Sequence, residues 1–531
     1  MKSLYLSILA FASGLLLASA WLGGPGLILL IAFIPLLYID DFFLQNRHRY
    51  RSVVYWGYSL ITFLIWNAAS TWWIWYATPV GALFAIIVNS FLMSLVWWLA
   101  HAVSRKKGVQ FGRMFLVFAW ISFEYLHYHW ELSWPWLTLG NGFANEVKII
   151  QWYEYTGVFG GTLWVLMVNL LLWNLIRIAG KNEGARLTGR ILVVLFVLFF
   201  PIVFSMVRYI NYAEKTDPVN LVIAQPNIDP YHEKFSRMSK EEQLNRLLHV
   251  CDSLGTDSTM FFIGPETALH DVWEDMPERN IQVLRIRRFL ADKYPNAVFV
   301  TGAMSYRLYS PGDKIPETAR YNEDSSLVYD AFNSACYIEG NNSVQYYHKT
   351  MLVSGVEKIP YSRYLKILDK LVVDLGGTTG SLGTTQESTI FVHDNVKVAV
   401  PVCYESGYGA YMATFVRGGA NLFFVITNDG WWKNSPGYKQ HLSYSRLRAV
   451  EFRRDIARSG NTGISCIINQ RGDMVKKTDW WKETSIAGIV NLNDKITFYA
   501  RYGDYIGRVG VLIFALMFLS FLVEVIKSIS M

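Results

Sequence analysis

Residues 398–407 read Val-Ala-Val-Pro-Val-Cys-Tyr-Glu-Ser-Gly, an apolar run that ends in a cysteine and a short polar turn. Such a run is typical of a strand buried in a sheet. A cysteine at a sharp turn just past a strand has backbone N–H groups beside its sulfur, and these lower the pKa of a thiol and can hold an oxyanion. The stretch therefore predicts an α/β sheet with Cys403 as a candidate nucleophile, although a lone cysteine is more often a core residue.

The segment around this stretch, from about Val219 to Asp494, alternates strand-like and helix-like patterns. Strands are expected at Val219–Ala224, Met260–Ile263, Ala297–Thr301, Ser326–Asp330, Lys397–Val402, Leu422–Thr427 and Gly463–Ile468. Helices are expected at Glu241–Leu254, Glu278–Lys293, Tyr408–Arg417 and His441–Ser459. This alternation favours a sheet covered by helices. The stretches 333–342 and 471–473 are typical of turns that join antiparallel strands.

The part of the chain before this segment is far more apolar. Hydrophobic residues make up 52% of the 531 residues and charged residues only 17%. Apolar runs with lengths close to the roughly 20 residues that cross a bilayer recur in this first part of the chain. They lie at Leu4–Ala20, Leu27–Ile39, Val53–Tyr76, Val80–Val103, Met114–Leu126, Val158–Ile178 and Ile191–Val207, with an eighth at Val509–Val525. Buried soluble helices are the alternative, but eight such runs favour membrane spans.

The distribution of charged residues predicts how the chain is oriented in the membrane. The first 210 residues hold 14 Lys and Arg against 7 Asp and Glu, so the net charge of +7 belongs to the apolar part and does not indicate a nucleic-acid partner. Basic residues cluster after the second, fourth and sixth runs, and the positive-inside rule then puts the N-terminus in the cytoplasm. We expect a seven-helix membrane domain at 1–210, an external domain at 211–508 and a last membrane helix at 509–531.

Two charged residues stand where predicted strands end. Glu266 follows the strand at 260–263 in the stretch Gly-Pro-Glu-Thr-Ala, and Lys349 follows the aromatic run at 346–348. Open α/β sheets bind ligands at the carboxyl ends of their strands. A carboxylate can take the proton of a thiol, and an ammonium group can stabilise the oxyanion that forms. Taken singly, each residue is more often a solvated charge.

The cysteine pattern indicates no metal site. Cys251, Cys336, Cys403 and Cys466 form no CxxC pair and have no zinc-type spacing. An external domain would permit disulfides, but the spacing names no pair. We expect neither a metal nor another cofactor.

Glu266, Lys349 and Cys403, in this order and at these strand ends, resemble the Glu-Lys-Cys triad of the nitrilase superfamily. Further stretches follow the same order: Lys349–Val353 with Glu357 after it, Cys403–Glu405, Asn428–Trp431, Arg446–Ala449, Arg458–Gly463 and Phe498–Asp504. A nitrilase-like domain between seven membrane helices and one is similar to the apolipoprotein N-acyltransferase family. The chain departs from it at Ser354-Gly355-Val356, where the family usually has Pro-Phe-Gly, which leaves the shape of the pocket open.

The resemblance implies a role for each residue. Glu266 is expected to be the general base and acid, Lys349 the cation beside the oxyanion, and Cys403 the nucleophile. It also implies supporting and substrate-binding residues: Glu357 positions the site, Tyr404 and Glu405 flank the nucleophile, Trp431 lines the substrate pocket, and Phe235 stands nearest to the place of an expected tryptophan. Glu357 could instead be a surface carboxylate, Tyr404 and Glu405 could be structural, and Trp431 could be an interfacial anchor.

The resemblance further implies a fold and a reaction. The fold is a multi-pass α-helical membrane protein that carries an extramembrane α/β nitrilase-like domain, an α-β-β-α sandwich. The reaction moves a fatty acyl group from a phospholipid, through a cysteine thioester, to the α-amine of a diacylglyceryl-cysteine on an apolipoprotein. We expect the bacterial inner membrane with the catalytic domain in the periplasm. The alternatives are a membrane-tethered amidase that hydrolyses a small C–N bond and a catalytically dead receptor.

Overall fold

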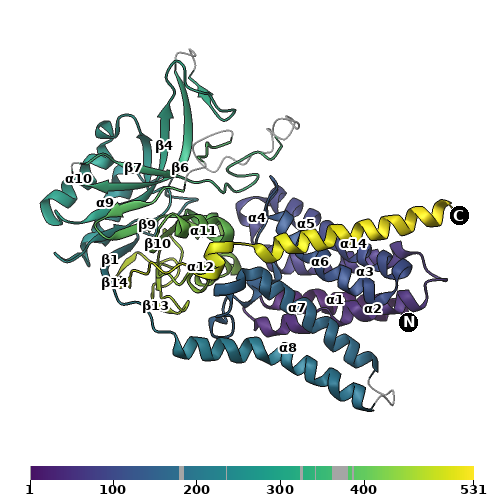
Figure 1. Cartoon of the computed structure of the whole chain (residues 1–531). Helices are drawn as coiled ribbons and strands as arrows, with labels where there is room; N and C mark the ends of the chain where they lie inside the picture. Colours follow the sequence, from purple (N-terminus) through teal and green to yellow (C-terminus); the bar gives the residue numbers. More distant parts are fainter. Residues whose placement is uncertain are drawn as a thin grey trace. The chain divides into compact units, whose positions relative to one another are not determined.

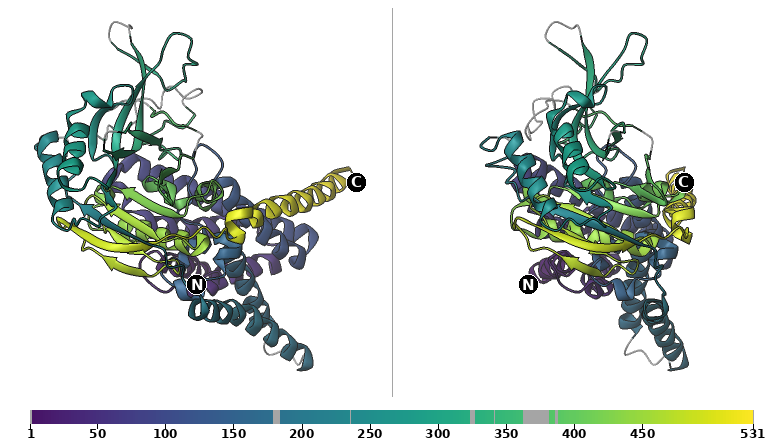
Figure 2. Two further views of the ribbon diagram at one scale, coloured as in Figure 1. Left: turned by 60° about the vertical axis from the view of Figure 1, so that its left-hand side comes forward. Right: turned by 90° about the vertical axis from the view of Figure 1, so that its left-hand side faces the viewer.

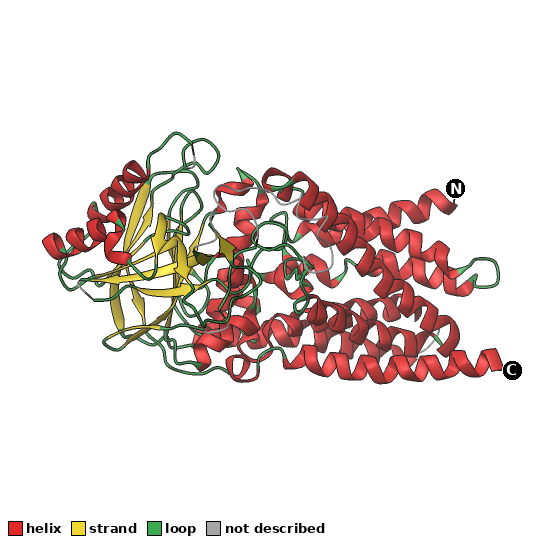
Figure 3. Cartoon of the chain, turned by 90° about the horizontal axis from the view of Figure 1, so that it is seen from above, coloured by secondary structure: helices red, strands yellow, loops and turns green. Residues whose placement is uncertain are grey.

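The computed structural model describes residues 2–178, 184–234, 236–322, 327–340, 342–361, 381–385 and 388–530 (Figure 1). The chain forms two compact units. The first holds Met1–Tyr212 and Tyr502–Met531, and the second holds Ala213–Arg501. In the described residues, the first unit is helical and the strands belong to the second (Figure 3).

Each predicted apolar run forms helix in the first unit. The helices are α1 (Lys2–Ser19), η1 (Gly26–Leu30) with α2 (Ile34–Gln45), α3 (Ser52–Thr71) with α4 (Ile74–Ala77), α5 (Pro79–Lys107), α6 (Val109–His127), α7 (Tyr153–Ile178), α8 (Gly184–Asn211) and α14 (Tyr505–Ser530). Two short 3₁₀ turns, η2 (Leu139–Phe143) and η3 (Val147–Ile149), lie between α6 and α7. Helix α3 packs against α1 and α5, and α6 packs against α5 and α14.

Six segments of the described residues are long and apolar enough to cross a membrane: 2–19, 26–45, 79–107, 153–178, 187–211 and 505–527. Helices α3 and α6, with 20 and 19 residues, are not among these six. The second predicted run is broken, since the 3₁₀ helix η1 and helix α2 share it. Some of the charges inside this unit are paired: Arg113 contacts Asp40 and Asp41 at 3.0 and 2.6 Å, and the ring of His101 lies 2.6 Å from Asp40.

Two sheets form the second unit. The first has the order β14-β1-β2-β4-β6-β5, with β3 beside β4 and β7 beside β6. Its strands are β1 (Pro218–Gln225), β2 (Phe261–Ile263), β3 (Leu269–Trp273), β4 (Val298–Leu308), β5 (Arg320–Tyr321), β6 (Val328–Glu339), β7 (Gln345–His348) and β14 (Thr484–Asn491). Strands β1, β2 and β4 run parallel, so their carboxyl ends lie at one edge.

The second sheet has the order β13-β12-β11-β10-β9-β8. Its strands are β8 (Phe391–His393), β9 (Val396–Ala399), β10 (Leu422–Thr427), β11 (Ile456–Gly460), β12 (Cys466–Ile468) and β13 (Met474–Lys477). Strands β9, β10 and β11 are parallel. The antiparallel pair β12–β13 confirms the turn predicted at 471–473, and β6 pairs antiparallel with β7 after the turn near 340.

The sheets pack face to face and helices cover their outer faces (Figure 2). Alternate residues of β1 show the layering: Leu221 and Ile223 join the core shared with β9–β12, whereas Val222 and Ala224 face α9 (Lys240–Asp252) and α10 (Ile281–Lys293). The period of two is that of a strand buried on both faces. Helices α11 (Gly409–Arg417) and α12 (Pro436–Phe452) cover the second sheet, which makes four layers, α-β-β-α.

One predicted helix was wrong in part. The helix expected at His441–Ser459 ends at Phe452, and Ile456–Gly460 is the buried strand β11. Arg453 stops the helix in the left-handed conformation, with φ of 53°. Its guanidinium donates to the Gln470 carbonyl at 3.3 Å, a contact that fixes it at this position. The four cysteines are all free.

Candidate active site

The candidate catalytic residues lie at strand ends of both sheets. Glu266 follows β2, and Lys349 directly follows β7. Cys403 follows β9, beyond Val402, which forms a parallel bridge with Ile426 of β10. Cys403 adopts a left-handed backbone conformation with φ of 53°, which is unusual for a residue with a Cβ. The sharp turn predicted at the cysteine is therefore present.

Lys349 lies between two carboxylates. Its Nζ donates to Glu266 Oε1 at 3.2 Å and to Glu357 Oε1 at 2.7 Å. The Asn333 amide donates to the same two oxygens at 2.8 and 2.9 Å. Glu357 is fixed from its other side, because Oε2 accepts the Val353 backbone N–H at 2.8 Å. The side chain of Lys349 is 1% exposed, so Lys349 is a buried, oriented cation and not a surface lysine.

The charges in this cluster stabilise one another. Burial lowers the pKa of Lys349, but the charges of Glu266, Glu357 and Cys403 outweigh it and the pKa is raised overall. Burial raises the pKa of Glu266, and Lys349 together with the Asn333 amide brings it below its ordinary value. The Asn428 backbone N–H also donates to Glu266 Oε2 at 3.0 Å. At neutral pH the site therefore holds an ionised Glu266 carboxylate and a protonated Lys349.

The electrostatics of Cys403 differ from the expectation. Burial raises the pKa of its thiol, and the charge of Glu266 raises it further. Lys349 and an interaction with Thr427 lower it, but the net pKa lies well above the ordinary value. The prediction of a thiol with a lowered pKa is therefore wrong, because the loss of solvent and the charge of Glu266 outweigh the lowering by Lys349 and Thr427. The side chain of Cys403 is therefore a neutral thiol at rest, and a base would have to take its proton before the sulfur could act as a nucleophile.

Glu405 ties the cysteine turn to the lysine segment. Its Oε1 accepts the Tyr347 hydroxyl and the Thr350 N–H, each at 2.7 Å, and its Oε2 accepts the Val402 N–H at 2.8 Å. The carboxylate is fully buried. Since Val402 precedes Cys403 and Thr350 follows Lys349, this one side chain ties the segment of Cys403 to the segment of Lys349.

Two of the other predicted residues, Tyr404 and Trp431, are described by the structure. The ring of Tyr404 is buried and packs edge-on against Tyr408. Trp431 lies in η7 (Asp429–Trp432), where its carbonyl accepts the Tyr231 hydroxyl at 2.6 Å and its ring packs edge-on against Tyr231. Phe235 lies outside the described residues.

The sequence did not single out two further residues near this cluster, Asn333 and Lys234. Asn333 is a polar residue inside the buried strand β6, and this contrast could have marked it. Lys234 is 5% exposed, and its Nζ donates to the hydroxyl of Thr267, the neighbour of Glu266. Burial lowers the pKa of Lys234 to about 8, although the charge of Glu266 raises it. The site thus has a second buried amine. The sequence did not indicate that Lys234 is buried, because its neighbours in the sequence are charged.

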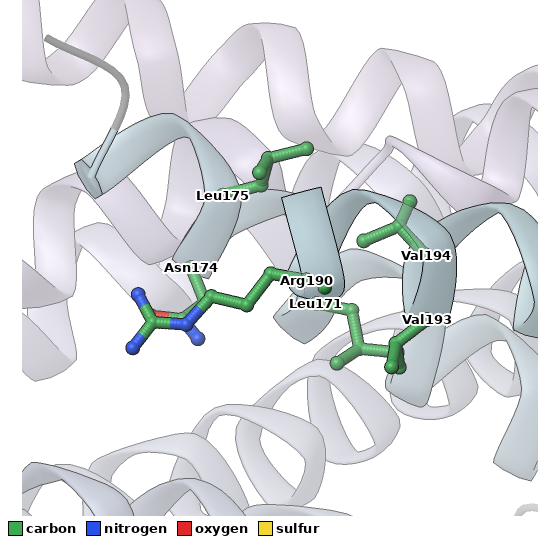
Figure 4. Close-up of a pocket in the computed structure, with 7 residues that line it drawn as sticks. Leu171, Asn174, Leu175, Arg190, Val193 and Val194 are labelled. Carbon is green, nitrogen blue, oxygen red and sulfur yellow. The ribbon is translucent and has the colours of Figure 1, made fainter. Parts of the chain in front are cut away.

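Two pockets lie elsewhere in the molecule. One of about 280 Å³ lies between α7 and α8, where Arg190 and Asn174 border an otherwise apolar lining of Leu171, Leu175, Val193 and Val194 (Figure 4). The other, of about 440 Å³, is lined by residues of α9, β3 and α10 such as Lys240 and His270. Neither includes Glu266, Lys349 or Cys403. In the described ranges, no group of three His, Cys, Asp or Glu side chains is arranged to hold a metal ion.

Two family models match different parts of the chain. The family model "Apolipoprotein N-acyltransferase N-terminal domain" matches residues 13–171, and the model "Carbon-nitrogen hydrolase" matches residues 221–494. A nitrilase-superfamily protein of Saccharomyces cerevisiae is similar among solved structures, at 12% identity and a TM-score of 0.36, covering 53% of this chain and 92% of that one.

Two relatives match over nearly the full length. The chain is 30% identical over 513 residues to the apolipoprotein N-acyltransferase of Chlorobaculum tepidum, which covers 94% of this chain and 93% of that protein. It is 26% identical over 516 residues to the enzyme of the same name from Geobacter metallireducens, covering 94% and 91%. The predicted resemblance and the nitrilase-like fold are confirmed, and the chain belongs to the apolipoprotein N-acyltransferase family of bacterial membrane acyltransferases.

Proposed function

We propose that this protein transfers a fatty acyl group from a membrane phospholipid to the α-amine of a diacylglyceryl-cysteine at the N-terminus of an apolipoprotein. Membership in the family supports N-acylation of lipoproteins as the reaction. The acyl group travels on Cys403, Glu266 moves the proton, and Lys349 stabilises the oxyanion. The observation that carries these roles is the buried Glu266–Lys349–Glu357 cluster, whose charges act on the thiol of Cys403.

In the first half-reaction, Glu266 takes the thiol proton as Cys403 Sγ attacks the carbonyl carbon of a phospholipid ester. The C–S bond forms and the carbonyl oxygen becomes an oxyanion beside the Lys349 ammonium. When the oxyanion collapses, the C–O bond to glycerol breaks and Glu266 returns the proton to the leaving oxygen. A lysophospholipid departs and a thioester remains on Cys403.

In the second half-reaction, the neutral α-amine of the lipoprotein attacks the thioester carbonyl. Glu266 accepts a proton from the nitrogen, the C–N bond forms, and the C–S bond breaks. Glu266 then passes the proton to the departing sulfur, which restores the neutral thiol that burial favours. The amide product and the free enzyme result, and no cofactor takes part in the balance.

The neighbouring residues support these steps. Glu357 holds Lys349 in place, and Glu405 fixes the distance between the lysine segment and the cysteine turn. We assign Tyr404 to the wall beside the nucleophile, and Trp431 and Phe235 to the substrate pocket. Each buried CH₂ of an acyl chain is worth about 0.8 kcal/mol, so both substrates keep their chains in the bilayer and the site must open at its surface.

The proposed setting is the bacterial inner membrane. Residues 1–210 and 509–531 form the membrane part, the N-terminus is cytoplasmic, and residues 211–508 face the periplasm, as the basic loops predict. An engineered cysteine on the external domain should react with a membrane-impermeant maleimide in intact spheroplasts. Reaction only after lysis would overturn this topology.

The experiment that tests the function compares two products. The purified protein receives phospholipid vesicles and a diacylglyceryl-cysteine peptide, and in parallel a small aliphatic amide. We expect an N-acylated peptide and a lysophospholipid in equal amounts, with no release of ammonia. The amidase alternative, which the family match does not favour, predicts steady ammonia release without acylated peptide. A Cys403→Ala variant should give neither product.

A further inference from the structure

A buried histidine contacts the backbone of the nucleophile from behind. His441 of α12 is fully buried, and its Nε2 donates to the Cys403 carbonyl oxygen at 3.0 Å. The Ser406 hydroxyl donates to the same oxygen at 2.8 Å and lies 3.2 Å from the ring nitrogen. The carbonyl of the nucleophile is therefore held by two side chains, neither of which belongs to the Glu266–Lys349–Glu357 cluster.

The other ring nitrogen of His441 faces an acid. Asp429 Oδ1 lies 2.9 Å from Nδ1, and Arg458 Nη2 donates to Asp429 Oδ2 at 2.7 Å. Burial raises the pKa of Asp429, but Arg458 and His441 bring it far below its ordinary value, so the group is a carboxylate. The Cys403 carbonyl can only accept, so Nε2 is the donor in that bond, and Nδ1 lies within hydrogen-bond distance of the carboxylate. Arg458 lies 3.2 Å from Nδ1, farther than from the carboxylate oxygen.

The carbonyl that His441 contacts belongs to the peptide bond between Cys403 and Tyr404, so its position affects the backbone on both sides. The peptide bond between Cys403 and Tyr404 is planar and trans, so fixing its C=O also fixes the N–H of Tyr404, which points the opposite way. Cys403 has φ of 53°, an unfavourable conformation for a residue with a Cβ, which persists only when its surroundings enforce it. The contacts from His441 and Ser406 supply that enforcement.

The residues at the end of β10, from Thr427 to Asp429, also contact Glu266. Asn428, the neighbour of Asp429, donates its backbone N–H to Glu266 Oε2 at 3.0 Å. Thr427 donates its hydroxyl to Asp429 Oδ1 at 2.8 Å, and its side chain also interacts with the Cys403 thiol. The end of β10 therefore links the histidine network, the thiol and the base within three consecutive residues.

We propose that His441, held by Asp429 and Arg458, is a positioning residue that locks the Cys403–Tyr404 peptide in the orientation needed to stabilise the oxyanion. It touches neither substrate nor the sulfur, and acts through the carbonyl of the nucleophile. This inference rests on the proposed function, since it concerns the acyl-transfer step at Cys403.

Two substitutions of His441 remove its hydrogen bonds to Cys403 and to Asp429 one at a time. In His441→Gln the side-chain amide nitrogen can take the place of Nε2 and still donate to the Cys403 carbonyl. In His441→Asn the amide nitrogen takes the place of Nδ1, so the bond to Asp429 remains and the bond to Cys403 is lost. We expect kcat for peptide acylation to fall about 100-fold in His441→Asn, as for loss of an oxyanion donor, and about tenfold or less in His441→Gln. KM should stay within about threefold in both, because the binding contacts are unchanged.

Alkylation of Cys403 by iodoacetamide provides the second readout, because that reaction forms no oxyanion. Its rate should stay within about threefold of the wild type in both variants. His249→Gln, an exposed histidine of α9, is the matched control and should match the wild type in all three measurements. If His441→Asn does not accumulate in membranes, Ser406→Ala, which removes the second donor to the same carbonyl, is expected to lower kcat with KM unchanged.

The outcomes are distinct. A wild-type protein that acylates no peptide overturns the proposed function, and this inference with it. An active wild type together with His441→Asn at wild-type kcat overturns the inference alone. Equal losses of kcat and of iodoacetamide reactivity in His441→Asn and His441→Gln would also overturn it, since they would show a general role in folding.

Discussion

The two units of the molecule place apolar and charged side chains in opposite ways. In the helical unit large apolar residues are exposed, such as Phe196 at 63% and Leu516 at 60%. In the α/β unit the apolar residues fill the core, and fully buried charges such as Lys349 and Arg458 gather near Cys403. The difference shows that the surface of the first unit suits lipid, whereas the second unit has a surface for water and buries charged groups near Cys403.

The largest expected effect is at the buried cation of the α/β unit. Lys349→Ala should lower the rate of acyl transfer by at least about 10² to 10³, because the oxyanion loses its stabilising charge in a desolvated site. Lys349→Arg should also fail, since a planar guanidinium does not replace a point charge between two carboxylates. Steady-state kinetics with Lys397→Ala, an exposed lysine of β9, provides the matched control. Near-normal turnover in Lys349→Ala would refute its role.

The second prediction compares lysine substitutions of one exposed apolar side chain in each of the two units. Leu516 of α14 and Val475 of β13 are both 60% exposed. Leu516→Lys should cost about 2.5–3.5 kcal/mol of membrane insertion, because a charge at the centre of a spanning helix meets hydrocarbon. Val475→Lys should change stability by less than about 0.5 kcal/mol, because that side chain meets water. Quantitative blots of membrane fractions and melting curves in detergent check both, and equal tolerance of the two lysines would remove the basis for the comparison.

The smallest effect concerns the second amine of the site. Lys234 is a cation below about pH 8 and favours the ionised form of Glu266. Lys234→Met removes that charge and raises the pKa of Glu266, so the acidic limb of kcat/KM should move to higher pH. The rate at the optimum should change little. A limb that stays in place or moves to lower pH in a full pH profile would show that Lys234 does not act on the base.

Much of this arrangement could be predicted from the sequence, since its signals are local. Apolar runs such as 80–103 and 191–207 are long enough to identify helices α5 and α8 without any knowledge of contacts. Glu266 and Cys403 stand directly after short apolar strands, so their positions at strand ends follow from local patterning. The roles of the triad came from its resemblance to a family, because single charged residues carry little information alone.

The parts that were missed depend on distant contacts. Strand β14 contains Gly488 and is paired with β1, more than 250 residues away in the chain, which local propensity cannot show. Strand β11 contains Arg458 and Ser459, whose polar side chains are buried only because Asp429 and the Ala224 carbonyl accept their hydrogen bonds. The raised pKa of the Cys403 thiol likewise depends on Glu266, which approaches it only in the fold.

The central claim is that the acyl group travels on Cys403, and the mass of the intact protein tests it most directly. The purified enzyme is incubated with phospholipid of defined chain length and without a peptide acceptor. We predict that the protein gains the mass of one acyl group, that the group maps to Cys403, and that addition of a diacylglyceryl-cysteine peptide removes it. The buried Cys251→Ala variant should behave like the wild type, and Cys403→Ala should gain nothing. The same adduct on Cys403→Ala, or none on an enzyme that acylates the peptide, would contradict the claim.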